Sequence, residues 1–423
     1  MDKTLLWLWL SLHFGEGSYV YGRLLEKYGS IEGIYETTEE DILGQNSVLS
    51  DPTDKSKILD KNLSHAIEVK NWCDENGIDI YTYDDEEYPV GLRLIPDFPA
   101  VLYCLGNLVN LDCELAIGVV GTRKMTVRGE KTAYNLGYTL SKGGACTVSG
   151  MAVGIDSAAH RGTLDAGGYT IAVLGSGINV IYPRANEYLY NRIIENGAVI
   201  TEYPPNTPPN GFHFPVRNRI ISAMCRGVVV VEGGEHSGSM ITARLAKKYK
   251  KQVFAVPGPG GEYYSAGPNK LIKYGAIVAE NAVDILEQYI DSTSCDINLS
   301  AAKILPKKKK SFKVASQFDE NRFYNNSTEE EEANLARKVI GLFKRRSKEE
   351  IKEKEEIDVN DLDTSILTMD ELKVYNAMEK GKMMTEENLL HLGYSVSALS
   401  VIMFNLEMNG FVKGIPGGFY IKK

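Results

Sequence analysis

The sequence predicts an α/β fold built on a doubly wound parallel sheet. Between residues 116 and 290, short runs rich in valine and isoleucine alternate with segments of helical spacing, such as Glu130–Ser141 and Met240–Tyr249. Each apolar run ends beside turn-forming residues such as Gly, Ser or Pro. Continuous apolar strands are expected where both sheet faces are covered, and their alternation with helices implies right-handed βαβ units. The expected strands are Ala116–Val120, Ala145–Val148, Thr170–Leu174, Val199–Ile200, Val228–Val231 and Val253–Val256.

This Rossmann-like domain is expected to span residues 116–290. A chain of 423 residues is too long for one ordinary core, so we expect two to four folded domains. The rest of the chain divides by composition and pattern. We interpret it as a helical region, a connector into the sheet, a charged linker and a C-terminal domain, at residues 1–70, 71–115, 291–363 and 364–423.

Residues 1–70 have the apolar spacing of several short helices. The run Leu5–Leu12 is interpreted as the buried face of a first helix, because it has neither the basic cluster nor the cleavage site of a signal peptide. The glycine-rich segment 15–30 resembles a helix-hairpin-helix or SAM-like unit, which can present backbone N–H groups to a phosphate. Because Glu16 lies in the hairpin and the surroundings are acidic, we favour a structural helical cap.

Residues 291–363 are low in apolar content and contain a basic block at Lys307–Lys310 and an acidic block at Glu329–Glu332. This composition predicts a charged, flexible linker.

Residues 364–423 are expected to form a winged helix. Helical segments begin at Met369, Thr385 and Ser395, and Gly410–Ile421 has the pattern of a two-stranded wing. Many winged helices bind duplex DNA through their third helix. Because Ser395–Asn409 contains no Lys or Arg, we favour a protein-interaction or weak DNA-binding role for this domain over sequence-specific readout.

The net charge of −9 argues at first sight against a nucleic-acid partner. The distribution is uneven. Residues 1–115 carry 8 Lys/Arg and 22 Asp/Glu, a net charge of −14, whereas residues 116–290 carry 18 and 12, a net charge of +6. A positive domain beside an acidic one suits a phosphate-bearing partner, and ordinary charge fluctuation explains the same counts equally well.

The six cysteines form no C-x-x-C pair, which argues against a zinc site or a disulfide framework and fits a reducing cytoplasm. No apolar run reaches the roughly 18 residues needed to span a bilayer, so we expect a cytoplasmic protein without a membrane partner. The sequence also lacks a P-loop, a G-x-G-x-x-G after the first strand, a G-x-S-x-G elbow and metal-spaced histidines. We therefore expect no cofactor, no metal and no catalytic role.

Gly-rich and Arg-bearing loops follow several predicted strands and form a candidate anion site. Glycines let a backbone approach a phosphate, arginine offers a forked set of donors, and a helix start such as Gly154–Ser157 offers free N–H groups. Each loop alone is weak support, because turns commonly use these residues. The predicted DNA-binding residues are Gly121, Thr122, Arg123, Ser149, Gly150, Arg184, Arg217, Asn218, Arg219, Ser237, Gly238 and Ser239.

Arginines from three separate loops suit a track of phosphates better than a single pyrophosphate. Tyr182, Phe212 and Phe214 lie near them in the sequence and could stack on unpaired bases, which contributes about 1–3 kcal/mol per base. Core packing is an equally good interpretation of Phe212 and Phe214.

At these residues the chain resembles the DprA/Smf family. The ordered set of motifs is specific, although each piece is not. The matching motifs are Val119–Arg123, Ser149–Asp156 with Ala158–His160, Thr170–Gly175, Tyr182–Pro183, Phe214–Ile221, Ser237–Ser239 with Thr242–Ala243, Val256–Gly258 and Leu271–Ala276.

The resemblance implies a protein that binds single-stranded DNA at the strand ends, forms a homodimer through the Rossmann-like domain and loads the RecA recombinase onto incoming DNA during natural transformation. It implies DNA contacts for Arg123 and Arg184. The chain departs from the family where Val153 replaces an arginine, and Arg128 is the candidate to compensate.

Two other hypotheses about the function remain. The segment Val231–Gly234 resembles, more distantly, a loop of phosphoribohydrolase-like Rossmann enzymes, with Glu232 or Asp156 as acid/base candidates for a nucleotide. Their structural interpretation is that Asp156 caps its helix and Glu232 pairs with a loop arginine. In the third hypothesis, the protein is a regulator and the winged helix is its functional domain.

Overall fold

The computed structural model describes residues 2–44, 47–49, 51–109, 111, 114–235, 237–292, 295–306, 367, 369–380, 382–394, 399, 402–403, 406, 411–415 and 419–422. The chain divides into one compact unit, Met1–Pro306 with Leu367–Lys423, and a second unit, Lys307–Ile366. The second unit and most of the predicted linker lie outside the described residues.

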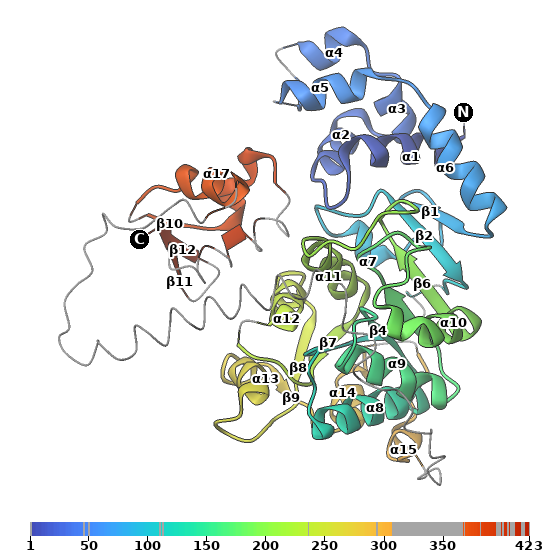
Figure 1. Cartoon of the computed structure of the whole chain (residues 1–423), viewed down its shortest axis with the longest axis vertical. Helices are drawn as coiled ribbons and strands as arrows, with labels where there is room; N and C mark the ends of the chain where they lie inside the picture. The colour runs from blue at the N-terminus through green and yellow to red at the C-terminus, as the bar shows by residue number, and fades with distance from the viewer. Residues whose placement is uncertain are drawn as a thin grey trace, which may run out of the picture. The chain divides into compact units, whose positions relative to one another are not determined.

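Six helices occupy the N-terminal region (blue in Figure 1), where the sequence predicts short helices. Side chains of Asp2, Ser30, Thr38 and Asp51 cap four of them, which satisfies backbone N–H groups that a helix start leaves free. The apolar run at the start of the chain is buried inside α1, as expected for a first helix. The helices are α1 (Lys3–Phe14), α2 (Val20–Tyr28), α3 (Ile31–Tyr35), α4 (Glu39–Leu43), α5 (Pro52–Leu59) and α6 (Ser64–Glu75).

The core of the molecule is a nine-stranded sheet in the order β1-β2-β6-β5-β4-β3-β7-β8-β9. The seven strands from β6 to β9 in this order pair in parallel, and β1 and β2 extend the sheet in antiparallel pairing. The strands are β1 (Asp79–Thr82), β2 (Val101–Gly106), β3 (Leu115–Val120), β4 (Ala145–Ser149), β5 (Thr170–Val173), β6 (Gly197–Thr201), β7 (Gly227–Val230), β8 (Gln252–Ala255) and β9 (Ile277–Val278).

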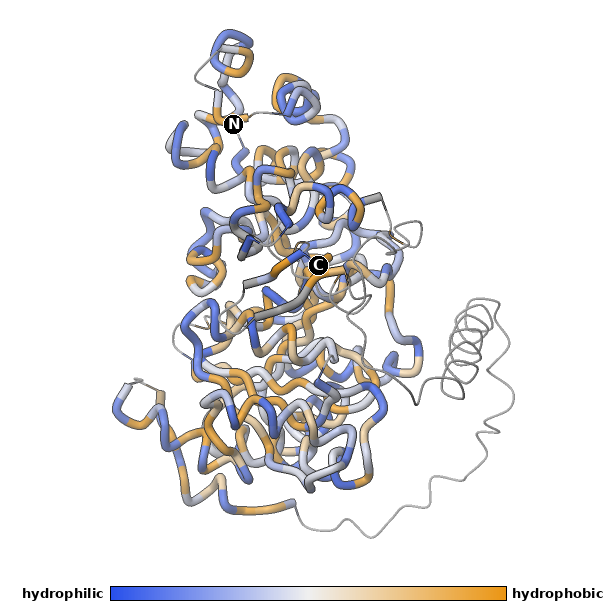
Figure 2. Tube along the Cα trace, turned by 90° about the vertical axis from the view of Figure 1, so that its left-hand side faces the viewer, coloured by the Kyte–Doolittle hydropathy of each residue, from blue (hydrophilic) through white to orange (hydrophobic). Residues whose placement is uncertain are grey.

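Helices cover both faces of this sheet. On β3, Ala116 and Val120 face one hydrophobic cluster with α11 and α12, whereas Ile117 and Val119 face a second cluster with α8, α9 and α14. Hydrophobic stretches recur along this part of the chain (Figure 2). The helices are α7 (Val90–Arg93), α8 (Val127–Lys142), α9 (Ile155–Asp165), η1 (Arg184–Asn186), α10 (Glu187–Asn196), α11 (His213–Met224), α12 (Gly238–Lys248), α13 (Tyr263–Lys273), α14 (Ala282–Leu286) and η2 (Glu287–Tyr289). The predicted doubly wound parallel sheet is therefore confirmed.

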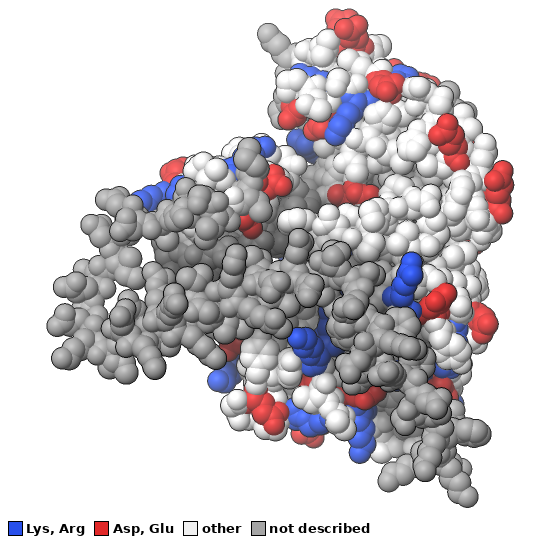
Figure 3. Space-filling view, in the orientation of Figure 1, with Lys and Arg blue, Asp and Glu red and all other residues white. Residues whose placement is uncertain are grey.

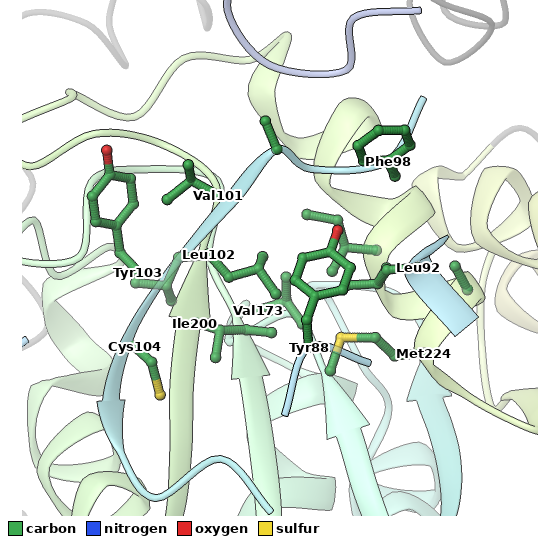
Figure 4. Close-up of a cluster of buried hydrophobic side chains, with 14 of the residues drawn as sticks. Tyr88, Leu92, Phe98, Val101, Leu102, Tyr103, Cys104, Val173, Ile200 and Met224 are labelled. Carbon is green, nitrogen blue, oxygen red and sulfur yellow. The ribbon is translucent and has the colours of Figure 1, made fainter. Parts of the chain in front are cut away.

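The segment predicted as a connector, residues 71–115, builds part of the core. It contributes β1, α7 and β2, and β2 pairs with β6 through partners such as Cys104 and Ile200. Figure 4 shows Tyr88 and Leu92 of this segment beside Met224 of α11. The sequence analysis did not identify these two strands.

The switch point of the sheet lies at β3. The chain proceeds from β3 to β4, β5 and β6 on one side, and then crosses to β7 on the other side of β3. In open α/β sheets, ligands bind in the crevice that such a reversal leaves outside the strand ends. The loops after β3 and β7 are therefore the natural place for a site.

The sheet domain extends beyond residue 290. Residues 295–306, which the sequence places in the charged linker, are described and contain α15 (Leu299–Ala302). The Asn298 amide donates to the Gly143 carbonyl, and Ala302 is buried beside α8 and α14. The first part of the predicted linker therefore packs on the domain.

The described C-terminal residues contain α17 (Met369–Ala377), β10 (Met383–Met384), η5 (Glu386–Leu392), β11 (Val412–Ile415) and β12 (Phe419–Lys422). The last two strands pair in antiparallel fashion, and β10 joins them in the order β10-β12-β11. Most of the predicted third helix, Ser395–Asn409, lies outside the described residues. The winged-helix assignment therefore stays a prediction, as does the SAM-like assignment of the N-terminal helices. No helix in the described part of the chain combines the length and the apolar character needed to cross a bilayer.

Candidate nucleic-acid interface

The loops that follow β3, β4 and β7 are bonded to one another at the carboxyl edge of the sheet. The Thr122 amide donates to the Glu232 carbonyl at 2.8 Å, and the Ile155 amide at the start of α9 donates to the Thr122 carbonyl at 3.2 Å. A Cβ atom on Gly121 would lie 2.5 Å from Ile155, so glycine permits this close packing of the loops. The predicted Gly-rich loops therefore do share one edge.

Two arginines from different elements meet at one aromatic ring on this edge. The guanidinium carbon of Arg123 lies 5.0 Å from the centre of the Phe214 ring, and that of Arg217 lies 5.9 Å from the same ring. Tyr182 contacts Phe214 with 5.6 Å between ring centres. We name Arg123, Tyr182, Arg184, Phe214 and Arg217 the strand-end rim.

Buried backbone groups hold Arg217 in position. Its Nη1 donates to the Gly150 carbonyl at 2.7 Å and also to the Val173 carbonyl. A Cβ atom on Gly150 would lie 2.5 Å from Nη2, so only glycine leaves room for the guanidinium there. Burial lowers the pKa of Arg217 to about 10, with Asp156 opposing the shift, so Arg217 stays charged at neutral pH.

The remaining rim residues are open to solvent. Arg123 and Arg184 are exposed, and Arg184 begins η1 directly after Tyr182–Pro183. Tyr182 is 41% exposed and Phe212 is 58% exposed, so neither is a core residue. Of the two phenylalanines, only Phe214 is held between other side chains.

The loop before α12 connects to the rim through Asn218. The Asn218 side chain accepts from Arg217 Nε at 3.2 Å and donates to the Gly238 carbonyl at 3.5 Å. Ser237 is the N-cap residue of α12, and its hydroxyl contacts that of Ser239 at 2.8 Å rather than a helix N–H group. The first turn of α12 therefore keeps backbone donors, of the kind that bind anions at helix starts.

Arg219 does not reach the rim. Its side chain is 0% exposed, and it binds Glu202 and lies 3.6 Å from Asp97 in the interior of the domain. A buried guanidinium that is paired with two carboxylates has no donor facing a phosphate in solvent. We therefore remove Arg219 from the proposed DNA-binding set and assign it a structural role.

Three other predicted site residues are buried, in addition to Arg217 and Arg219. Ser149 donates its hydroxyl to the Val119 carbonyl at 2.6 Å, which ties β4 to β3. Gly150 receives Arg217, and Ser239 is only 6% exposed. These residues shape the strand-end rim without facing the solvent, whereas Gly121 and Thr122 are partly exposed.

The two acid/base candidates of the enzyme reading are engaged in holding the loops. Glu232 accepts from the Thr126 amide at 2.9 Å and from the Thr126 hydroxyl at 2.6 Å, and Arg128 lies 3.8 Å away. Asp156 is buried and accepts from the Gly150 amide at 3.1 Å. Burial raises the pKa of Asp156, with Arg217 acting against it.

The sequence analysis missed one exposed cation, Lys124, which follows Arg123 directly and is exposed at the same loop. Arg128, the candidate to compensate for Val153, binds Ser265 at 3.1 Å and lies near Glu232 and Glu262, so its charge is already shared. Val153 itself is 39% exposed beside the start of α9. Lys124 is therefore exposed in a loop where the charge of Arg128 is already shared.

The distribution of charged side chains does not by itself identify the interface. On the described surface of the face shown in Figure 3, Lys and Arg side chains over the sheet domain are interspersed with Asp and Glu. No group of three or more His, Cys, Asp or Glu residues within the described ranges is arranged to hold a metal ion. The interface is distinguished by two arginines that lie against one ring, that of Phe214.

Known proteins share this domain. A family model described as DNA recombination-mediator protein A matches residues 79–290, a range that begins at β1 and so includes both antiparallel strands. The DNA processing protein DprA of Bacillus subtilis (strain 168) is 42% identical over 214 residues, which cover 51% of this chain and 72% of that protein. Protein Smf of Escherichia coli (strain K12) is 41% identical over 217 residues, which cover 51% of this chain and 58% of that protein.

A solved structure has the same fold over most of the described chain. The X-ray structure of DNA processing protein A (DprA) from Streptococcus pneumoniae superposes with a TM-score of 0.57 at 33% sequence identity. The superposition covers 64% of this chain and 93% of that chain.

Proposed function

Because the chain belongs to the DprA/Smf family of DNA recombination-mediator proteins, we propose that it binds single-stranded DNA along the strand-end rim. In this proposal the protein acts by binding rather than by catalysis. It protects incoming DNA and loads the RecA recombinase during natural transformation or homologous recombination. It acts in the cytoplasm as a homodimer that forms through the sheet domain.

The observation that carries the proposal is the Arg123–Phe214–Arg217 arrangement. Exposed Arg123 offers a phosphate contact beside the partly exposed Phe214 ring, whereas Arg217 is 4% exposed and lies against the same ring from the interior. A cation beside a stacking surface suits a polyanion whose bases are unpaired, because aromatic stacking needs a base face that a duplex keeps inside its helix. Exposed Tyr182 extends the stacking surface from Phe214 towards Arg184, which follows it by two residues.

The engagement of Glu232 and Asp156 supports binding over catalysis. A general acid or base needs a free oxygen within reach of a substrate proton. Both Glu232 carboxylate oxygens accept from Thr126, and Asp156 supports the loop that holds Arg217. Turnover in a screen of nucleotides would instead favour the phosphoribohydrolase-like alternative.

The proposal is tested by titrating labelled oligo-dT and its duplex with oligo-dA into the purified protein at two salt concentrations. We expect preference for the single strand and weaker binding at higher salt, because neutralised phosphates release counterions. Arg123→Glu should weaken binding to every single-stranded sequence alike, since a backbone contact carries no sequence information.

Lys303→Glu is the matched control. Lys303 is an exposed cation that follows α15 at the opposite edge of the sheet, and its replacement changes the net charge by the same amount. We expect the Lys303→Glu protein to bind oligo-dT nearly as the unchanged protein does. Equal affinities for the Arg123→Glu and Lys303→Glu proteins would remove the support for the strand-end rim.

A further inference from the structure

A second cationic site lies at the amino edge of the sheet, opposite to the strand-end rim. Arg226 immediately precedes β7 and Lys251 immediately precedes β8, so both lie where these parallel strands begin. Together with residues after η2 they line an open hollow of about 310 Å³. We name this the amino-edge hollow. Its lining residues are Arg226, Tyr249, Lys250, Lys251, Gln252, Tyr289 and Ser292.

The charge of the hollow is positive. Arg226 and Lys250 are exposed and form no ion pair with any residue that the structure describes. Lys247 and Lys248 lie in the last turn of α12, just before the lining residues, and do not line the hollow themselves. The turn that follows fixes the next two lysines, because the Lys250 amide donates to Lys247 and the Lys251 amide donates to Ala246. Lys250 adopts a φ of 58°, in the left-handed region that favours glycine.

Tyr289 lines the same hollow, and its buried hydroxyl has no partner among the described residues. Tyr289 is 6% exposed and its ring packs on Phe254, with 6.3 Å between ring centres. Its hydroxyl is buried and has no hydrogen-bond partner within the described part of the chain. A Cβ atom on Gly227 would lie 2.3 Å from this oxygen, so glycine at the start of β7 makes room for it. Leaving such a group unpaired is costly, which points to a ligand that accepts its hydrogen.

The chemistry of these groups selects an anion with several acceptor oxygens. Burial raises the pKa of Tyr289, so the hydroxyl stays protonated and donates. Gln252 Oε1 also lacks a partner, and rotation of the amide would present the Nε2 donor in its place. Cations, a hydroxyl donor and an amide donor together match the oxygens of a phosphate group.

We propose that the amino-edge hollow binds a phosphate group through Arg226, Lys250 and the Tyr289 hydroxyl. The phosphate belongs either to a small phosphate compound or to the backbone of a nucleic acid, since both present the same oxygens. The site is separate from the strand-end rim and does not depend on the function proposed for that rim.

Thermal unfolding of the full-length protein tests the site with inorganic phosphate as the probe. We expect phosphate to raise the midpoint of unfolding above the value in sodium chloride of equal ionic strength, because a ligand that binds the folded state stabilises it. Tyr289→Phe keeps the ring on Phe254 and removes only the hydroxyl. It should require about tenfold more phosphate for the same rise, the effect of one hydrogen bond to a charged ligand.

Arg123→Glu separates this site from the rim and should respond to phosphate as the unchanged protein does. The proposal is overturned if phosphate gives no rise beyond chloride, if Tyr289→Phe responds like the unchanged protein, or if the rise disappears in Arg123→Glu. A failure of the unchanged protein to bind oligo-dT would contradict the proposed function and leave this result untouched.

Arg226→Gln distinguishes the two sources of phosphate. If DNA backbone occupies the hollow, the slope of log affinity for oligo-dT against log salt should become shallower by about 0.7, the value for one phosphate contact on a single strand. If the slope is unchanged while the response to inorganic phosphate weakens, the ligand is a small phosphate compound. Either result supports the hollow as a phosphate site.

Discussion

At the scale of single residues, the hydrogen bonds around His160 determine where its proton lies. Nδ1 of His160 is 2.7 Å from Thr170 Oγ1, and Thr170 Oγ1 donates its only hydrogen to the Thr147 carbonyl at 2.7 Å. The Thr170 hydroxyl must therefore accept from Nδ1, which carries the ring hydrogen. Nε2 is buried and has no partner among the described residues. Burial, with Arg217 nearby, lowers the pKa of His160 to about 3.

This histidine should make folding stability depend on pH. An unfolded chain protonates histidine below about pH 6.5, whereas folded His160 stays neutral down to about pH 3. The contribution is therefore fully present above pH 6.5 and is lost as the pH falls, at up to about 1.4 kcal/mol per pH unit. Urea unfolding at pH 7, 6 and 5 should show a steeper loss for the unchanged protein than for His160→Gln. Parallel pH profiles would contradict the buried neutral ring.

Arg217 and Arg219 show which part of the site the sequence pattern could predict. The Arg-Asn-Arg triplet looks like one cationic loop in the sequence, but it lies within α11. Two positions apart on a helix correspond to about 200° around its axis, so the two side chains point to opposite sides. Arg217 reaches the strand-end rim, and Arg219 enters the interior. The residue types predicted that the triplet is cationic. Only its position on the helix determines where each arginine side chain points.

At the scale of elements, a buried charged cluster joins the N-terminal helices to the sheet. Arg219 of α11 binds Glu202, which follows β6, and lies 3.6 Å from Asp97 ahead of β2. Glu202 also accepts from the Gly17 amide at 3.3 Å, between α1 and α2. Burial raises the pKa of Glu202 to about 7, although Arg219 acts against the shift. One guanidinium thus serves carboxylates from two segments.

Removing Arg219 should therefore destabilise the fold strongly. Arg219→Met keeps much of the side-chain volume but removes the guanidinium that faces the buried Glu202 and Asp97 carboxylates, which should cost about 3–5 kcal/mol. Arg192→Met is the matched control, because Arg192 pairs with Asp165 at 3.1 Å near the surface, and such pairs contribute at most about 1 kcal/mol. Urea unfolding of both variants measures the difference. A loss below 1 kcal/mol for Arg219→Met would show that the cluster does not hold these elements together.

The sequence predicted those strands that have a clear pattern within their own residues. All six expected strands overlap strands of the sheet, because buried parallel strands are marked by continuous apolar runs. The strands β1 and β2 were missed for two reasons. The four residues of β1 are too few to show a periodic pattern. The apolar run of β2 is equally compatible with a buried helix. The pairing of β2 with β6 brings together residues about 100 positions apart, which no local pattern encodes.

At the scale of the whole molecule, the sheet order places two groups of cations from residues 116–290 at opposite edges of the sheet. The carboxyl edge carries Arg123, Arg184 and Arg217, and the amino edge carries Arg226 and the lysines after α12. Alternation of strands and helices predicts a parallel sheet, and hence a carboxyl edge, but it does not predict which strands are neighbours. The amino-edge hollow depends on β7 lying beside β8, so the sequence alone could not reveal it.

Removing residues 364–423 should leave single-stranded DNA binding within about twofold of the full chain. The rim residues all lie between Arg123 and Arg217, and the predicted third helix of the C-terminal domain contains no Lys or Arg to contact phosphates. Because the salt slope counts neutralised phosphates, it should also stay constant after the deletion. Titration of oligo-dT into both proteins at several salt concentrations measures affinity and slope together, with thermal unfolding of the shortened protein as the folding control. If the shortened protein is still folded but no longer binds DNA, the DNA site lies in the C-terminal domain. That result would favour the hypothesis that the protein is a regulator.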